Sequence, residues 1–214
     1  MGQSASEDLG RQTDYGPVSI WRRYGIQPGI RGIIKDPFPF RDPPELEQWF
    51  SLRSGRRVHL RPYRSGDEEA YRRLFLKMTP KDIWFRYFSY LKDAPESELK
   101  KFRNVNYASD LKFIANAVDR GKMPETIGII GLSFDTRRSI AEFALIVRSD
   151  QKRQGLGRIM LNKVTGYARC QGYKRLVAEV LRTNFAMLNL STALGFESHR
   201  VPGDDEVTIY LDLT

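Results

Sequence analysis

A short basic loop at residues 148–158 carries the side chains best suited to bind an anion. Its two glycines, Gly155 and Gly157, lack a Cβ, so a phosphate group can approach the main chain closely. Four cationic side chains accompany them: Arg148, Lys152, Arg153 and Arg158. This combination predicts an anionic ligand, specifically a phosphate or a pyrophosphate.

The elements around the loop would point it at such a ligand. An apolar run at residues 142–147 predicts a strand before the loop, and an amphipathic pattern that continues to about Cys170 predicts a helix after it. Unpaired N–H groups and the positive end of the helix dipole would then face the anion. The loop fits neither common nucleotide motif, because Met160 replaces the third glycine of a dinucleotide loop and the Gly-Lys-Ser/Thr of a Walker loop is absent.

Two motifs resemble one protein family. The order Lys152-x-x-Gly155-x-Gly157 after a strand resembles the acetyl-CoA pyrophosphate loop of GCN5-related N-acetyltransferases, the GNAT family, although that family usually has Gln or Arg in place of Lys152. Residues 184–196, which begin at an asparagine and end in Leu-Gly-Phe, resemble the second signature of the family. The resemblance implies an α/β (α+β) GNAT fold, with a mixed central sheet of about six to seven strands flanked by about four helices.

The GNAT resemblance also implies acetyl-CoA as the acyl donor, with CoA as a product, and it assigns residues to this cofactor. They belong to the end of the strand before the loop, to the loop itself and to the start of the second motif. The implied set is Leu145, Ile146, Val147, Lys152, Arg153, Gln154, Gly155, Leu156, Gly157, Arg158 and Asn184.

Within the GNAT family, residues 58–213 are similar to the catalytic domain of bacterial Pat-type protein lysine acetyltransferases. The likeness is carried by Arg61-Pro62, Asp67-Glu68, Arg86-Tyr87-Phe88-Ser89 and Ala141-Glu142-Phe143-Ala144 leading into Val147-Arg148-Ser149-Asp150. It implies a protein lysine as the acceptor, with acyl-CoA synthetases as the acceptor proteins. An alternative interpretation of Arg86-Tyr87-Phe88 is a pair of core aromatic residues behind a surface arginine.

Acyl transfer to an amine requires a group that takes a proton from the ammonium. Glu142 is the expected base, because it is a carboxylate early in the apolar strand before the loop, where burial would raise its pKa toward the working range. The alternative is a solvent-facing glutamate, since a shift of one residue reverses the face of a strand. Glu179, in the strand-like run at 176–180, is the reserve candidate.

The group that protonates the leaving thiolate is less well defined by the sequence. The family often has a tyrosine four residues before the glycine of Leu-Gly-Phe, and here Ser191 occupies that position. Its hydroxyl is far less acidic than a phenol, but a thiolate with a free-thiol pKa of about 8.5 can leave unaided. Asn184 is expected to contact pantetheine or to orient a water, and its alternative is a plain helix N-cap.

The composition describes a soluble globular protein with a basic surface. Of its 214 residues, 41% are hydrophobic and 29% charged, and no apolar run approaches the roughly 18 residues of a membrane helix. The single Cys170 excludes an internal disulfide and suits a reducing cytoplasm, and two histidines with one cysteine predict no metal site. The net charge of +9 favours an acidic protein surface around the acceptor lysine, whereas no motif for nucleic acid accompanies it.

Residues 1–55 differ from the rest because they are rich in proline and glycine, which predicts an extended arm with about its first fifteen residues disordered. Residues 56–214 form the predicted acetyltransferase domain. Strands are expected at 58–62, 113–118, 126–134, 140–147, 176–180, 197–201 and 207–211, and early helices at 67–77 and 79–88. Turns at 135–138 and 202–205 would close two hairpins.

Three functions remain compatible with these residues. The first is a protein lysine N-acetyltransferase, and the second is a GNAT enzyme that acetylates a small amine, because the same core supports both. The third is an acyl-CoA-binding regulator with little catalysis, which the missing tyrosine favours and which Glu142 argues against.

Overall fold

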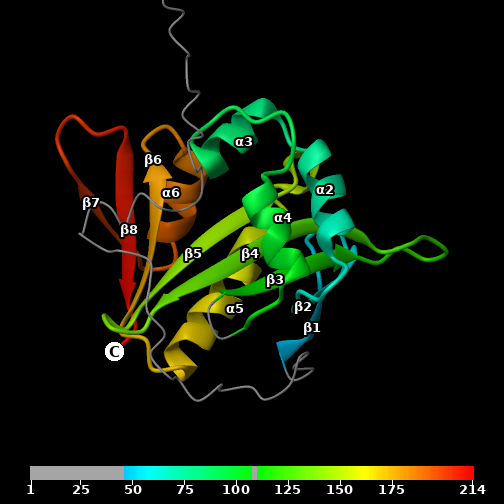
Figure 1. Cartoon of the computed structure of the whole chain (residues 1–214), viewed down its shortest axis with the longest axis horizontal. Helices are drawn as coiled ribbons and strands as arrows, with labels where there is room; N and C mark the ends of the chain where they lie inside the picture. The colour runs from blue at the N-terminus through cyan, green and yellow to red at the C-terminus, as the bar shows by residue number, and fades with distance from the viewer. Residues whose placement is uncertain (1–45, 108–109) are drawn as a thin grey trace, which may run out of the picture.

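The computed structural model describes residues 46–107 and 110–214, and its centre is a sheet of eight strands (Figure 1). The strands lie in the order β1-β2-β3-β4-β5-β6-β8-β7. Their bounds are β1 Gln48–Ser51, β2 Arg57–Pro62, β3 Asp110–Ala117, β4 Glu125–Asp135, β5 Ile140–Val147, β6 Arg175–Leu181, β7 Glu197–Arg200 and β8 Glu206–Asp212. The helices are α2 Glu68–Leu76, α3 Pro80–Tyr87, α4 Glu96–Arg103, α5 Leu156–Cys170 and α6 Phe185–Thr192, with a 3-10 turn, η2, at Ser149–Gln151.

The predicted α/β class with a mixed sheet is confirmed, with slightly more strands and helices among the described residues than expected. Both predicted hairpin turns are present. Asp135 ends β4, and its carboxylate accepts hydrogen bonds from the N–H groups of Arg137 and Arg138 at 3.1 and 3.2 Å. Between β7 and β8, Gly203 has a φ of 88°, a left-handed conformation that glycine adopts without strain.

The sheet opens between β5 and β6. These two strands are parallel, and their pairing covers only Ile140–Glu142 against Arg175–Val177. Beyond this point they diverge (Figure 1). Strand β5 stays paired with β4 over its whole length in one unbroken register. The second half of β5 therefore has an edge that β6 does not cover, and its backbone groups are available to a ligand.

Helices cover both faces of the sheet. On one face, Tyr167 of α5 packs against the rings of Phe113 and Phe134, with centroids 6.4 and 6.2 Å apart. Helices α2 and α4 pack on each other, and α2 packs on β4 (Figure 1). Because Ser133 pairs with Glu142 across β4 and β5, the two side chains share one face. Both line a small pocket with residues of α2 and α4, which places Glu142 on the face of these helices.

Local signals account for α3 but not for α4. Thr79 caps α3 by accepting from the N–H of Asp82 at 3.3 Å, and Pro80 follows at the first helical position, as predicted. Helix α4 did not emerge from the sequence pattern, because it is a short, strongly polar segment. Its buried apolar residues are Leu99 and Phe102, and tertiary packing supplies the stability that the local pattern does not show.

The sheet begins earlier in the chain than the predicted domain boundary at residue 56. Strand β1, Gln48–Ser51, pairs antiparallel with β2, so the last part of the segment assigned to the arm contributes an edge strand. Residues 1–45 of the predicted arm, including its first fifteen residues, lie outside the described residues. The turn that follows β1 contributes a side chain to the candidate active site.

Candidate active site

A pocket of about 360 Å³ lies beside the uncovered half of β5, between α3, the start of α5 and α6. We call it the donor pocket. It contains ten of the eleven residues that the sequence assigned to the cofactor: Leu145, Ile146, Val147, Lys152, Arg153, Gly155, Leu156, Gly157, Arg158 and Asn184. Its volume lies within the usual range for small-molecule sites, roughly 300–1,000 Å³.

The loop before α5 has the backbone conformation of an anion site. Gly155 has a φ of 90° and is the N-cap residue of α5, and no side chain caps the helix. The first N–H groups of this 15-residue helix therefore have no intrahelical acceptor and lie at the positive end of its dipole. Arg153 also has a positive φ, 65°, which tightens the loop. This geometry agrees with the predicted phosphate site.

Gly157 lies at the start of α5, close to side chains of α6 and β5. A Cβ at this position would lie 3.2 Å from Cδ2 of Leu190 and 3.7 Å from Cδ2 of Leu145. The first distance is shorter than normal contact, so Leu190 would have to move. Glycine here keeps the pocket between the two helices open.

Three of the four loop cations lie in the pocket lining, and one does not. Lys152, Arg153 and Arg158 are exposed residues of the lining. Lys152 also forms an ion pair with Asp82 of α3, which holds the loop against that helix. Arg148, in contrast, is buried and pairs with Asp150 at 2.5 Å and with Glu125 at 2.6 Å. Two carboxylates thus hold Arg148 at the start of the loop, outside the pocket lining.

The eleventh predicted cofactor residue, Gln154, lies just outside the lining and binds the turn after β1. Its carbonyl oxygen accepts from the N–H of Arg53 at 3.2 Å, and its side-chain oxygen accepts from the N–H of Ser54 at 3.1 Å. These bonds bring the Arg53 side chain into the donor pocket. Sequence analysis missed Arg53 because its position depends on the pairing of β1 with β2.

Helix α6 and its N-cap residue form another part of the donor-pocket lining. Asn184 caps α6, accepting from the N–H of Met187 at 3.2 Å, and it also lines the donor pocket. Ser191 is buried, lies outside the pocket lining and donates to the carbonyl oxygen of Leu188 at 2.9 Å. This bond gives the Ser191 hydroxyl a structural role, and nothing in its surroundings supports the predicted role in proton transfer.

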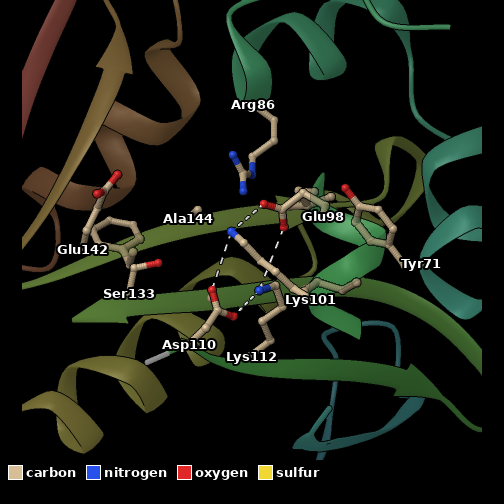
Figure 2. A pocket seen from close by; sticks show the side chains of 13 residues that line it. Tyr71, Arg86, Glu98, Lys101, Asp110, Lys112, Ser133, Glu142 and Ala144 are labelled. Carbon is tan, nitrogen blue, oxygen red and sulfur yellow. Dashed lines mark hydrogen bonds and ion pairs between the residues drawn. The ribbon is translucent and has the colours of Figure 1, made fainter. Parts of the chain in front are cut away.

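Glu142 lines a second, smaller pocket of about 30 Å³, which we call the base pocket (Figure 2). The side chain is buried, with 6% of its surface exposed, and its Oε2 has no hydrogen-bond partner among the described residues. Burial is the main cause that raises the pKa of Glu142 to about 8, and the nearby Glu179 adds to it. The solvent-facing alternative is thus wrong, and Glu142 is matched to accept a proton near neutral pH.

Glu179 lies on β6, opposite Thr208 of the neighbouring strand β8. The Thr208 hydroxyl donates to its Oε1 at 2.7 Å. Glu179 is half-buried and lines neither of the two pockets, although it influences Glu142 electrostatically. The reserve role therefore has less support from the geometry than the role of Glu142.

The base pocket is lined by a set of charged side chains that sequence analysis did not assign. Figure 2 shows Glu98 and Lys101 of α4 beside Asp110 and Lys112 of β3, with Arg86 of α3 above them. Burial opposes ionisation of Glu98, but Lys112, Lys101 and Arg86 hold its pKa at about 2. Glu98 is therefore an anion at any physiological pH.

Comparison with known proteins agrees with this geometry. The Acetyltransferase (GNAT) family model matches residues 76–196, more than half of the chain. Acetyltransferase PA5475 of Pseudomonas aeruginosa is 28% identical over 167 residues, which cover 78% of this chain and 89% of that protein. Among solved structures, the GNAT domain of S. lividans PAT has a TM-score of 0.71 at 21% identity, covering 79% of this chain and 98% of that one. Spermidine N-acetyltransferase from Vibrio cholerae, in complex with CoA and spermine, has a TM-score of 0.58 at 16% identity, covering 73% and 95%.

The chain belongs to the GNAT family. It is an acyl-CoA-dependent N-acetyltransferase, and acetyl-CoA is its acyl donor. The donor pocket fits this cofactor: the uncapped start of α5 and three exposed cations suit the phosphates, and the uncovered edge of β5 offers backbone groups to the pantetheine arm. Acetyl-CoA supplies the thioester when it is bound.

Two further features describe the part of the chain in the structure. None of its helices is long and apolar enough to cross a membrane. Its histidine, cysteine and carboxylate side chains form no group of three or more that could hold a metal ion.

Proposed function

We propose that this enzyme acetylates lysine ε-amines of folded proteins. The observation that carries the proposal is the buried Glu142 beside the divergence of β5 and β6, with a pKa raised to about 8. An ε-ammonium is a weak acid with a pKa of about 10.4, so it must lose its proton before nitrogen attacks a thioester. A carboxyl whose pKa lies nearer that of the amine accepts this proton more readily than an exposed glutamate would.

Two observations favour a protein over a small amine as the acceptor. The first is the fold likeness to the GNAT domain of S. lividans PAT, which covers 98% of that domain. The second is the net charge of +9, which repels free polyamines and attracts acidic protein surfaces. Acyl-CoA synthetases are the acceptors that the Pat-type resemblance of the sequence implies. The single cysteine, Cys170, suits a reducing cytoplasm, and the Pat-type resemblance suggests that this cytoplasm is bacterial.

Acetylation of a small polyamine is the second candidate. The fold likeness to a spermidine N-acetyltransferase supports it, since the same core serves both kinds of acceptor. Family membership favours either enzyme over a regulator that only binds acyl-CoA.

Labelled acetyl-CoA, a host lysate and the purified enzyme separate these candidates. We expect label on discrete protein bands, which mass spectrometry assigns to lysine, and no such label with a Glu142→Gln variant. Free spermidine and lysine methyl ester serve as small-amine acceptors in parallel. Rapid acetylation of these amines without labelled proteins would replace the first candidate with the second.

A further inference from the structure

Arg86 lies in the wall between the two pockets. It lines the donor pocket and the base pocket, and Ile146 is the other residue common to both linings. Figure 2 shows its guanidinium reaching from α3 into the space between Glu142 on one side and Glu98 on the other. The guanidinium carbon lies 4.9 Å from the ring centroid of Tyr87, a cation–π contact that helps to hold the side chain there.

The other charges of the base pocket balance one another. Lys101 lies 2.9 Å from Oε1 of Glu98 and 3.6 Å from Oδ2 of Asp110. Lys112 pairs with Asp110 and lies 3.9 Å from Oε2 of Glu98. These contacts join two ammonium groups and two carboxylates, as the dashed lines in Figure 2 show. The four residues therefore carry no net charge.

Arg86 is the cation of the base-pocket lining whose charge these ion pairs do not neutralise. Within residues 46–107 and 110–214, no carboxylate forms an ion pair with it, and its buried Nε meets no acceptor. On the other side of the cavity, Oε2 of Glu142 is equally without a partner in those residues. A buried polar group without a partner is costly, so two such groups on one cavity call for a common explanation.

We propose that Arg86 is a positioning residue whose charge allows Glu142 to ionise inside the base pocket. With Glu142 protonated, the pocket carries one cation in excess, and with Glu142 ionised its charges balance. The cavity of about 30 Å³ is large enough for a water, which would connect the two groups. The inference rests on the proposed role of Glu142 as the base and adds the residue that keeps this base usable.

The surroundings of Glu142 decide which charge matters most. The titratable or charged groups around it are Tyr71 of α2, Arg86 and Tyr87 of α3, Glu98 and Lys101 of α4, Asp110 and Lys112 of β3, and Glu179 of β6. Burial raises the pKa of Glu142 most, Glu179 raises it further, and Arg86 and Lys101 lower it. Because two carboxylates already share Lys101, Arg86 is the cation on which the ionised form of Glu142 depends.

The test is a titration of Glu142 in the protein without acetyl-CoA. Carbon-13 NMR of glutamate carboxyl groups, assigned with Glu142→Gln, follows this one group in the wild type and in two variants. In Arg86→Gln we expect the pKa of Glu142 to rise by about one unit or more, and in Arg86→Lys to stay close to the wild type, because lysine retains the charge. Arg73→Gln, on the exposed face of α2, is the matched control.

The pH profile of kcat/KM provides the second readout. The acidic limb should move to higher pH in Arg86→Gln by the shift that NMR measures, so that activity lost at pH 7 returns in part at higher pH. Arg86→Met is a second neutral variant if the glutamine form does not fold. An unchanged titration of Glu142 in a folded, neutral variant overturns the inference, and so does a lysine variant as impaired as the neutral ones. Because the titration needs no acceptor, its outcome is independent of whether lysine proves to be the substrate.

Discussion

The backbone N–H of Arg53 donates a hydrogen bond to the carbonyl oxygen of Gln154 at 3.2 Å, joining the turn after β1 to the loop before α5. Arg56, the residue just before β2, adds a second contact between the two segments, because its side chain donates a hydrogen bond to Oε1 of Gln151 at 3.1 Å. The turn after this edge strand thus contributes to the lining of the donor pocket, where the Arg53 side chain adds a cation.

Replacing Arg53 with alanine should weaken CoA binding roughly threefold to tenfold, the range expected for one partly exposed charged contact to a phosphate. Calorimetry at two salt concentrations would show the effect, and the loss should be larger at low salt. Arg57→Ala is the matched control, because Arg57 is an exposed neighbour that stacks on Trp49 at 5.0 Å and lies outside the pocket lining. Equal losses in the two variants would remove Arg53 from the cofactor site.

Glu142→Gln should lower turnover by roughly a hundredfold or more while leaving CoA affinity nearly unchanged. The reason is that glutamine keeps the size of the side chain but cannot accept the proton, and Glu142 does not line the donor pocket. Steady-state rates and calorimetry measure the two quantities separately. Glu179→Gln serves as the comparison, and a larger loss of turnover in that variant would transfer the role of the base to Glu179.

The same Glu142→Gln variant should be more stable than the wild type at pH 8 and about equally stable near pH 4.5. The folded protein holds the proton of Glu142 up to about pH 8, whereas the ordinary pKa is 4.5, so ionisation costs stability progressively as pH rises between these values. The variant avoids this cost, on the order of a few kcal/mol at pH 8. Urea unfolding at both pH values measures it, and a gain that does not depend on pH would contradict the raised pKa.

Much of the donor pocket could be predicted because its signals are local in the sequence. A strand, a loop with Gly155 and Gly157, and a helix start follow one another without interruption, and the capping asparagine Asn184 opens the second motif. The base pocket is different. Arg86 and Glu98 lie on separate short helices, and they meet Glu142 only through tertiary packing that no local pattern encodes. The face of Glu142 likewise depended on its register with β4.

Gly157→Ala should weaken CoA binding several-fold with only a small change in stability. The added Cβ would lie 3.2 Å from the flexible end of Leu190, so either this side chain or the ligand must give way in the donor pocket. Gly166→Ala, in the same helix, is the control, because its Cβ would meet no atom within 4 Å. We expect that control to bind CoA normally and to gain roughly 0.5–1 kcal/mol of stability from better helix propensity. Calorimetry measures CoA binding by the two variants, and thermal unfolding measures their stability. Normal CoA binding by Gly157→Ala would show that the pocket tolerates a Cβ there.

Acetylation of a protein acceptor should be faster at low salt than at high salt. The net charge of +9 attracts an acidic protein surface, and this attraction weakens as the Debye length falls from about 10 Å at 0.1 M to about 3 Å at 1 M ionic strength. The rates should be measured at saturating acetyl-CoA, so that salt effects on the phosphates of the donor do not contribute. The modified lysine should lie among acidic residues on a folded acceptor, because docking of two surfaces supplies the binding energy. A short peptide around the same lysine is the control, and we expect it to react more slowly and with less dependence on salt. Equal rates for the peptide and the folded acceptor, or a protein rate that does not change with salt, would contradict recognition through an acidic surface.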